Sequence, residues 1–134
     1  MSAEADILCK YKTIAVVGLS NNDALPAYSV AKYMQDAGYR IIPVNPNETQ
    51  VLGEKAYSDI VSIPEQVEIV DIFRRPEYVG AVVADAIAAG AKAVWMQQGI
   101  INKEAAANAR AAGLEVVMDE CIRTWHRRLQ ATLQ

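Results

Sequence analysis

The stretch TIAVVGLSNN, residues 13–22, decides the fold of this chain. Its first five residues are β-branched or apolar on consecutive positions, which is typical of a strand buried on both faces of a parallel sheet. Gly18 ends that run, and the polar residues behind it are typical of a loop that leads into a helix. A strand, a glycine turn and a helix in this order predict a βαβ unit.

Four further runs of the same character follow along the chain, and helical patterns separate them. Within these patterns, apolar side chains recur at the three- and four-residue spacing of one helix face. Strands that alternate with helices predict an α/β fold, here a Rossmann-like doubly wound parallel sheet in a single domain over residues 1–134. The four runs are residues 39–44, 68–73, 91–96 and 114–118.

The order of the strands depends on residues 51–57, VLGEKAY. This stretch is too short for a complete βαβ unit, and we interpret it as a small edge strand with a turn. Six strands then take the order 3-2-1-4-5-6, with residues 68–73 as strand 4. If residues 51–57 are only a loop, the flavodoxin-like order is the alternative.

Several helix ends can be predicted from capping residues and from proline. The second helix is expected to start near Ala27, behind a loop that contains Pro26. Short polar side chains that precede a helical pattern accept hydrogen bonds from the first free amides of the helix. The predicted caps are Ser2 for residues 3–10, Asn102 for residues 103–112 and Asp119 for the last helix.

Composition and charge narrow the function classes. The chain has 134 residues, of which 52% are hydrophobic and 22% charged, a composition typical of a globular protein. Its net charge of −3 disfavours a broad basic surface for nucleic acid. No apolar run reaches the roughly 18 residues that span a membrane, and the acidic N-terminus differs from a signal peptide. Two cysteines make neither a disulfide framework nor a metal site, so we expect a cytoplasmic protein.

Ligands of open α/β sheets bind beyond the carboxyl ends of the strands, where the strand order reverses. In the predicted order this point lies between strands 1 and 4. The loop that follows strand 1 contains Gly18, Ser20, Asn21 and Asn22, which provide close backbone approach and polar donors. Together with backbone amides that enter a helix, they predict a phosphate-binding loop, and a plain connecting turn is the alternative.

The same loop departs from the dinucleotide fingerprint, because it has one glycine where G-x-G-x-x-G has three. An NAD site also places an acid at the end of strand 2 to bind the ribose. Here the chain reads PVNP over residues 43–46, and the next acid is Glu48. NAD is therefore disfavoured, whereas an apolar slot for adenine between Val44 and Pro46 stays open as an interpretation.

Two consecutive arginines, Arg74 and Arg75, follow strand 4 and precede a helix that starts near Pro76. Positive charges at a helix N-terminus oppose the helix dipole and therefore need an anionic partner. That partner is either a ligand phosphate or a carboxylate such as Glu77 or Asp71.

The remaining polar positions are ambiguous between packing and function. Gln97, Gln98 and Gly99 after strand 5 are either turn residues or amide contacts to the far end of a ligand. Cys121 at the last helix is either a favoured thiolate or a small buried hydrophobe, and a Cys121–His126 pair is a further alternative. We find no Ser-His-Asp arrangement and no P-loop. The sequence therefore indicates a binding site more readily than a reaction, and we assign no catalytic residue.

Five separated stretches carry a resemblance to a known family, namely residues 14–20, 39–46, 51–53, 70–77 and 95–100. Together and in this order, they resemble the stand-alone CoA-binding domain family. That family is similar to the N-terminal domain of the succinyl-CoA synthetase α subunit, and the resemblance covers roughly residues 11–129. It implies a Rossmann-like fold that binds coenzyme A or an acyl-CoA along the strand ends.

The resemblance also implies which part of the coenzyme each stretch would contact. The pyrophosphate would lie along Gly18, Ser20 and Asn21, with Asn22 nearby. The adenosine would lie between Val44 and Pro46, with polar contacts from Asn45 or Asn47. The middle of the ligand would lie beside Phe73, Arg74 and Arg75, and the pantetheine would meet Gln98 and Gly99.

Two departures limit what the resemblance implies. The first loop lacks the additional glycine of the synthetase, and we expect no second domain to follow, which in the synthetase carries the phosphorylated histidine. His126 does not match that histidine, so ligase chemistry is not carried over. We therefore expect a module that binds a small-molecule nucleotide ligand, CoA or acyl-CoA, and neither nucleic acid nor membrane. An NADP-dependent oxidoreductase of the same fold and a nucleotide-regulated interaction protein are the alternatives, and the oligomeric state stays open.

Overall fold

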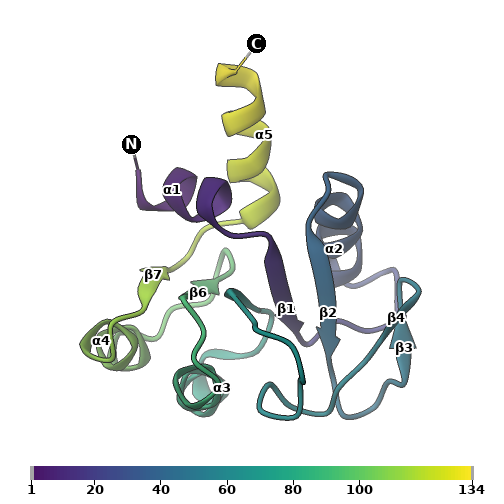
Figure 1. Ribbon diagram of the computed structural model, residues 1–134, viewed down its shortest axis with the longest axis horizontal. Coiled ribbons are helices and arrows are strands. Elements are labelled where there is room, and N and C mark those ends of the chain that lie inside the picture. The colour runs from purple at the N-terminus through teal and green to yellow at the C-terminus, as the bar shows by residue number, and fades with distance from the viewer. Residues whose placement is uncertain (1, 134) are drawn as a thin grey trace.

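The structure is a computed structural model that describes residues 2–133, in which strands and helices alternate along the chain (Figure 1). The alternation follows the spacing of apolar residues, since the buried strands are consecutive apolar runs and the helices bury one stripe each. The elements are α1 (Ala3–Lys10), β1 (Thr13–Val17), α2 (Pro26–Asp36), β2 (Arg40–Val44), β3 (Gln50–Val51), β4 (Glu54–Lys55), β5 (Ile69–Ile72), α3 (Pro76–Ala88), β6 (Ala93–Met96), α4 (Lys103–Ala111), β7 (Glu115–Val117) and α5 (Ile122–Thr132).

Five strands form one parallel sheet in the order β2-β1-β5-β6-β7. The register places Val17 at the end of β1 between Val44 of β2 and Ile72 of β5. The chain runs outward from β1 to β2 and later outward from β5 to β7, so the strand order reverses between β1 and β5. The predicted doubly wound parallel α/β fold is therefore confirmed.

The predicted six-strand order 3-2-1-4-5-6 is wrong, because residues 51–57 do not form a strand of the main sheet. Leu52 and Gly53 have φ angles of 54° and 77°, which gives a two-residue turn of the kind that joins β3 and β4 into a separate antiparallel hairpin. Only Tyr57 reaches the sheet, through one isolated bridge to Val44. Numbered along the chain, the five sheet strands take the order 2-1-3-4-5, which is the flavodoxin-like alternative.

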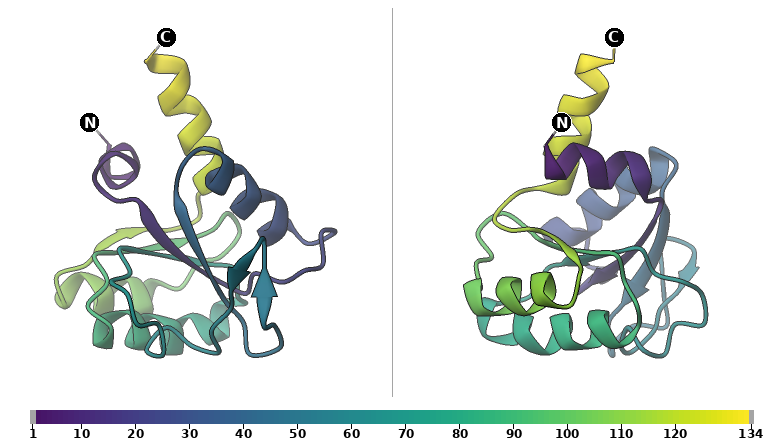
Figure 2. Two further views of the ribbon diagram at one scale, coloured as in Figure 1. Left: turned by 45° about the vertical axis from the view of Figure 1, so that its right-hand side comes forward. Right: turned by 60° about the vertical axis from the view of Figure 1, so that its left-hand side comes forward.

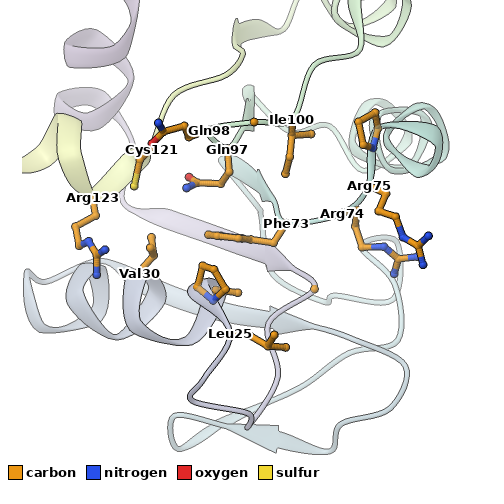
Figure 3. A pocket seen from close by; sticks show the side chains of 15 residues that line it. Leu25, Val30, Phe73, Arg74, Arg75, Gln97, Gln98, Ile100, Cys121 and Arg123 are labelled. Carbon is orange, nitrogen blue, oxygen red and sulfur yellow. The ribbon is translucent and has the colours of Figure 1, made fainter.

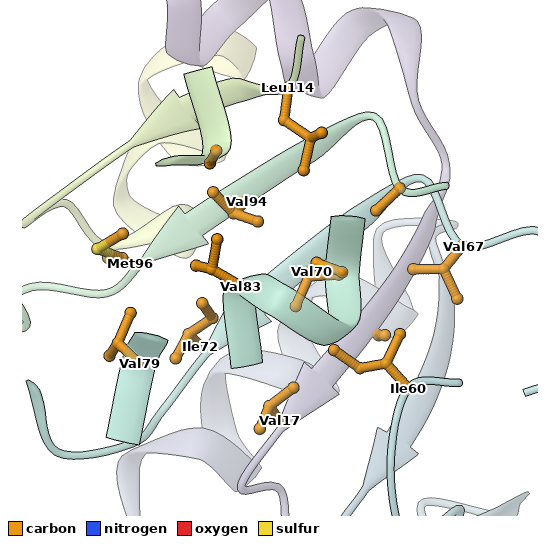
Figure 4. Packing of buried hydrophobic residues seen from close by; sticks show 14 of the residues in the cluster. Val17, Ile60, Val67, Val70, Ile72, Val79, Val83, Val94, Met96 and Leu114 are labelled. Atoms are coloured by element: carbon orange, nitrogen blue, oxygen red, sulfur yellow. The ribbon is translucent and has the colours of Figure 1, made fainter. Parts of the chain in front are cut away.

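Helices cover both faces of the sheet, which forms the middle of three layers (Figures 1 and 2). On one face α3 and α4 pack down, and Val79 and Val83 of α3 contact the cluster that contains Val70, Ile72 and Val94 (Figure 4). On the other face α1, α2 and the first turn of α5 surround a second buried cluster. Each fully buried valine or isoleucine contributes about 1.5–3 kcal/mol, so these two cores hold the strand ends in place.

Side-chain caps fix two helix starts as predicted. The Ser2 Oγ accepts a hydrogen bond from the Ala5 amide at 3.2 Å, and the Asn102 Oδ1 accepts one from the Ala105 amide at 3.0 Å. Both helices thereby satisfy one of the amides that a helix start leaves free.

Two other predicted helix starts are wrong. Asp119 does not cap the last helix: its φ is 64°, its carboxylate accepts a hydrogen bond from the Gly99 amide at 2.7 Å, and Cys121 is the N-cap of α5. Pro26 is not in the loop before α2 but is its first residue, where the fixed φ of proline suits a helix and its missing N–H has no consequence.

The C-terminal helix α5 leaves the body of the molecule after its first turns (Figure 2). Ile122 at its start is fully buried, whereas Leu133 at its end is 73% exposed. Within residues 2–133, no helix has the length and apolar character needed to cross a membrane.

Candidate functional site

The ends of β1, β5 and β6 and the first turns of α2, α3 and α5 surround one cavity of about 670 Å³. It lies where the strand order reverses between β1 and β5, the place at which open α/β sheets bind ligands. Figure 3 shows Arg74 and Arg75 at one end, Cys121 and Arg123 at the other, and the Phe73 ring between them. Of the predicted site residues, those that line the cavity are Gly18, Phe73, Arg74, Arg75, Gln98 and Gly99.

Gly18 brings the loop after β1 close to the loop after β5. Its φ is 95°, and a Cβ at this position would lie less than 3.0 Å from the carbonyl oxygen of Phe73. Its amide donates a hydrogen bond to the Val44 carbonyl at 2.9 Å. Only glycine combines this backbone conformation with so close an approach, so the residue shapes the floor of the cavity.

Three helices point their N-termini at the cavity, and the N-cap side chain of each makes no capping hydrogen bond. These N-cap residues are Leu25 of α2, Arg75 of α3 and Cys121 of α5. The two helices that side chains do cap, α1 and α4, contribute nothing to the lining. Because helix N-termini carry partial positive charge and free amides, their convergence favours an anion in the cavity.

The charge of the lining has the same sign. Arg74, Arg75 and Arg123 line the cavity, and no aspartate or glutamate does. The guanidinium groups of Arg74 and Arg75 lie 5.0 and 5.8 Å from the ring centre of Tyr78, and no salt bridge within residues 2–133 joins either to a carboxylate. The structure therefore does not support the alternative in which Glu77 or Asp71 neutralises the two arginines.

A second, smaller hollow of about 210 Å³ adjoins the first at the ends of β1 and β2. Val44 and Pro46, the predicted walls of the adenine slot, both line it. Arg74 and Tyr78 line it as well, so Arg74 belongs to both hollows. Arg74 therefore lies between the two spaces, with the end of β2 on one side and the start of α5 on the other.

Five predicted polar residues line neither hollow, namely Ser20, Asn21, Asn22, Asn45 and Asn47. The Asn21 amide and side chain instead donate to the Glu48 carboxylate at 2.7 and 3.0 Å. The Asn21 amide was expected to bind a phosphate of the ligand. In the structure it binds the carboxylate of Glu48 instead.

The other predicted polar side chains hold their own loops. The Asn45 side chain donates to the Leu19 carbonyl at 3.3 Å, and its Oδ1 accepts from the Asn47 amide at 2.9 Å. The Ser20 Oγ accepts from the Asn22 amide at 3.2 Å. The bond from Asn45 to Leu19 connects the loops after β1 and β2, and the other two bonds lie within one loop each.

Sequence reasoning missed part of the lining. Leu25 and Ile100 form apolar walls, and Arg123 reaches the cavity from the first turn of α5. Gln97, which the sequence left ambiguous, is buried, and its Oε1 accepts a hydrogen bond from the Ile122 amide at 3.1 Å. Of these residues, only Arg123 could have been recognised from the sequence, because it is an arginine at a helix start, as Arg75 is.

Cys121 and His126 lie in separate environments. The ring nitrogens of His126 lie 2.8 Å from the Tyr33 hydroxyl and 3.3 Å from the Gln130 amide nitrogen, and the ring does not line the cavity. Burial, and to a lesser extent the charge of Lys12, lowers the pKa of His126. With both nitrogens engaged elsewhere, His126 does not serve as a base for Cys121. No cluster of three potential metal-binding side chains occurs in the described part of the chain.

Fold and cavity together define a Rossmann-like α/β protein with an acid-free, arginine-lined cavity at the reversal of its sheet. The family model described as CoA binding domain matches residues 12–127. The chain therefore belongs to the CoA-binding domain family, which the resemblance in the sequence indicated.

Two similar proteins align with almost the whole of this chain, and a ligase aligns with part of it. The uncharacterized protein YneT of Bacillus subtilis is 43% identical over 121 residues, which are 90% of each chain. A hypothetical protein from Pyrococcus horikoshii OT3 has a TM-score of 0.93 at 39% identity, with 97% of this chain and 93% of that one covered. The ADP-forming acetate–CoA ligase II of Archaeoglobus fulgidus is 31% identical over 83 residues, 60% of this chain but only 12% of the ligase.

Proposed function

We propose that this protein binds coenzyme A or an acyl-CoA across the two hollows that share Arg74. The observation that carries the proposal is the larger cavity, which joins three helix N-termini without capping side chains to Arg74, Arg75 and Arg123. No acidic side chain lines this larger cavity, whereas Asp59 and Asp85 line the smaller hollow. Such a cavity suits a ligand with several phosphates, and membership of the CoA-binding domain family names the ligand class.

The positions of the two hollows on either side of Arg74 support one orientation of the ligand. The adenosine lies in the smaller hollow between Val44 and Pro46, and Arg74 contacts phosphate where the hollows meet. The pyrophosphate follows the loop at Gly18, and the pantetheine runs past Phe73 toward Gln98 and Gly99. In this orientation Ser20, Asn21 and Asn22 shape the phosphate loop, and Asn45 and Asn47 hold the loop beside the adenosine.

The oxidoreductase alternative has less support in the site. Asn45 follows β2 where an NAD site has an acid, and the loop after β1 keeps a single glycine. An NADP 2′-phosphate would still find arginines in the cavity. A fluorescence titration with NADPH separates the two ligand classes, and saturable NADPH binding tighter than CoA binding would favour the oxidoreductase.

Thermal unfolding with added ligand tests the proposal. A ligand present at about 100 times its Kd stabilises a protein by about 2.7 kcal/mol, which raises the melting temperature of a chain of this size by about 10 °C. We expect this shift with CoA and acetyl-CoA, and a smaller one with dephospho-CoA if the 3′-phosphate is bound. If none of the three shifts melting at millimolar concentration, the proposal is wrong.

A matched pair of charge variants locates the phosphates. Arg74→Gln is expected to weaken CoA binding about 10- to 100-fold, because a charge-assisted hydrogen bond contributes about 1.5–3 kcal/mol. Arg110→Gln removes the same charge from an exposed position in the last turn of α4, which does not line either hollow. Equal loss of affinity in both variants would mean that net charge, rather than a site at Arg74, attracts CoA.

A further inference from the structure

Among the arginines that line the cavity, Arg123 is the one that the proposed orientation of CoA leaves without an anionic group. It lies at the end away from Arg74 and Arg75 (Figure 3). All phosphates of CoA belong to its nucleotide half, which this orientation places at Arg74. The pantetheine that approaches Arg123 is uncharged, so the charge at this end of the cavity has no counterpart in CoA itself.

The protein does not supply that counterpart either. Within residues 2–133, no salt bridge joins Arg123 to a carboxylate. The hydrogen bond that its Nη1 donates to the Ser29 hydroxyl on α2 is long, at 3.4 Å, and its Nε is buried without a partner in the described part of the chain. Arg123 as a whole is half-buried, and a charge that has lost part of its hydration favours a paired anion. The arrangement therefore indicates an anion that comes with the ligand.

The walls that lead to Arg123 are apolar. Leu25 and Val30 line the cavity from α2 and its N-cap, and Ile100 lines it from the loop after β6. Val30 directly follows Ser29, so the Arg123 guanidinium lies beside the end of this apolar stretch (Figure 3). Methylene groups favour such walls, and a guanidinium favours a carboxylate. A chemical group that fits here has methylenes along its length and a negative charge at its far end.

Two backbone amides near this end of the cavity are already engaged by the protein. The Ile122 amide at the start of α5 donates to the Gln97 Oε1 at 3.1 Å. The Gly99 amide donates to the Asp119 carboxylate at 2.7 Å. Because these amides have partners, the recognition of an anion at this end depends on the Arg123 guanidinium.

We propose that the acyl-CoA bound in this cavity carries a free carboxylate at the far end of its acyl group, and that Arg123 binds this carboxylate. The ligand class is then the monothioester of a short dicarboxylic acid with CoA. The inference rests on the proposed CoA binding, because the orientation with the adenosine in the smaller hollow sends the acyl group past Phe73 to Arg123. A planar guanidinium matches a carboxylate with two parallel hydrogen bonds, and an uncharged acyl chain offers none.

The net charge of the protein disfavours such a ligand, so a preference for it reports on the local site. The chain has a net charge of −3, and a carboxylate on the acyl group makes the ligand more negative. Without a cation at the acyl end, repulsion between the two molecules would weaken the binding. Tighter binding of a carboxylated acyl-CoA than of a neutral one of similar length therefore requires a positive group beside the acyl chain.

Calorimetric titration of the full chain with two acyl-CoAs of similar length tests the inference. Glutaryl-CoA ends in a carboxylate, and hexanoyl-CoA ends in a methyl group. We expect the wild type to bind glutaryl-CoA about tenfold more tightly, which is the effect of one charge-assisted pair. Arg123→Gln is expected to remove this preference, and Arg123→Lys to keep part of it. Arg127→Gln is the matched control and should keep all of it, because Arg127 is exposed on the same helix and lines neither hollow.

Titration with free CoA separates this inference from the function on which it rests. If the wild type binds CoA and binds the two acyl-CoAs equally, CoA binding stands and the recognition of a carboxylate is wrong. An unchanged preference in Arg123→Gln would place the responsible cation elsewhere. If Arg123→Gln weakens the binding of free CoA as much as Arg74→Gln does, Arg123 holds a phosphate and the inference is wrong. If the wild type binds none of the three compounds, the proposed function is wrong as well.

Discussion

Replacing Gly18 by alanine tests how the floor of the cavity is built. The left-handed conformation with a φ of 95° destabilises the folded state by about 1–2 kcal/mol when the residue is alanine. The new Cβ also lies less than 3.0 Å from the Phe73 carbonyl oxygen, and 3.4 Å from the Phe73 Cβ, so the backbone at the end of β5 must move. Such overpacking costs about 1–3 kcal/mol in addition.

The two effects together predict that Gly18→Ala destabilises the fold by about 2–5 kcal/mol and lowers the melting temperature by about 8–20 °C. Gly38→Ala is the matched control, because Gly38 has a φ of 103° and a Cβ there meets nothing within 4 Å. It is expected to show the conformational effect alone, with a loss of about 1–2 kcal/mol.

Denaturant unfolding of both variants, followed by titration with CoA, completes the experiment. Gly18→Ala is also expected to lose most of its CoA affinity, because Phe73 and the loop after β1 separate, whereas Gly38→Ala binds normally. If the two variants lose the same stability, or if Gly18→Ala keeps full affinity, the close approach of the two loops does not shape the site.

Three further predictions concern charge and pH. Because the folded-state pKa of Asp71 is raised, its carboxyl binds more protons in the folded chain; the free energy of unfolding of the wild type should therefore fall, relative to Asp71→Asn, as the pH rises from about 4 toward 8. An unchanged difference in urea titrations across that range would contradict it. His126 behaves oppositely: its lowered pKa means that stability falls as the pH drops below about 6.5, and His126→Gln should flatten that decline in melting temperature. Glu48→Gln removes a negative charge from the Asn21 amide and should strengthen CoA binding about two- to fivefold in calorimetry; weaker binding would mean that Glu48 itself contacts the ligand.

The main sheet could be predicted because burial on both faces leaves consecutive apolar runs in the sequence. The hairpin after β2 could not, since Leu52 is an unusual residue for its left-handed turn position. Its conformation is held from elsewhere: the Gln35 side chain donates to the Leu52 carbonyl at 3.0 Å. Asp119 was misassigned for a similar reason, because its carboxylate binds the amide of Gly99, twenty residues away.

Gly18 and the arginines 74 and 75 of the candidate site could be predicted from the sequence, whereas Arg123 and the apolar walls were missed. Gly18 and the arginines of residues 74–75 stand at strand ends, where the topology alone brings them together. Leu25 and Ile100 are ordinary apolar residues, and nothing in their types distinguishes a cavity wall from core. The contact of Asn21 with Glu48 joins two loops, and no local pattern shows that the protein supplies its own anion there.

The single bridge between Val44 and Tyr57 affects whether the sheets of two molecules can pair edge to edge. It occupies the outer side of β2, where the Tyr57 amide donates to the Pro43 carbonyl at 3.0 Å and the Asn45 amide donates to the Tyr57 carbonyl at 2.8 Å. At the opposite border, β7 has three residues, and its Glu115 forms a salt bridge with Lys10. Neither border presents a long row of free backbone groups, so concentrated solutions should resist strand-by-strand polymerisation into fibrils.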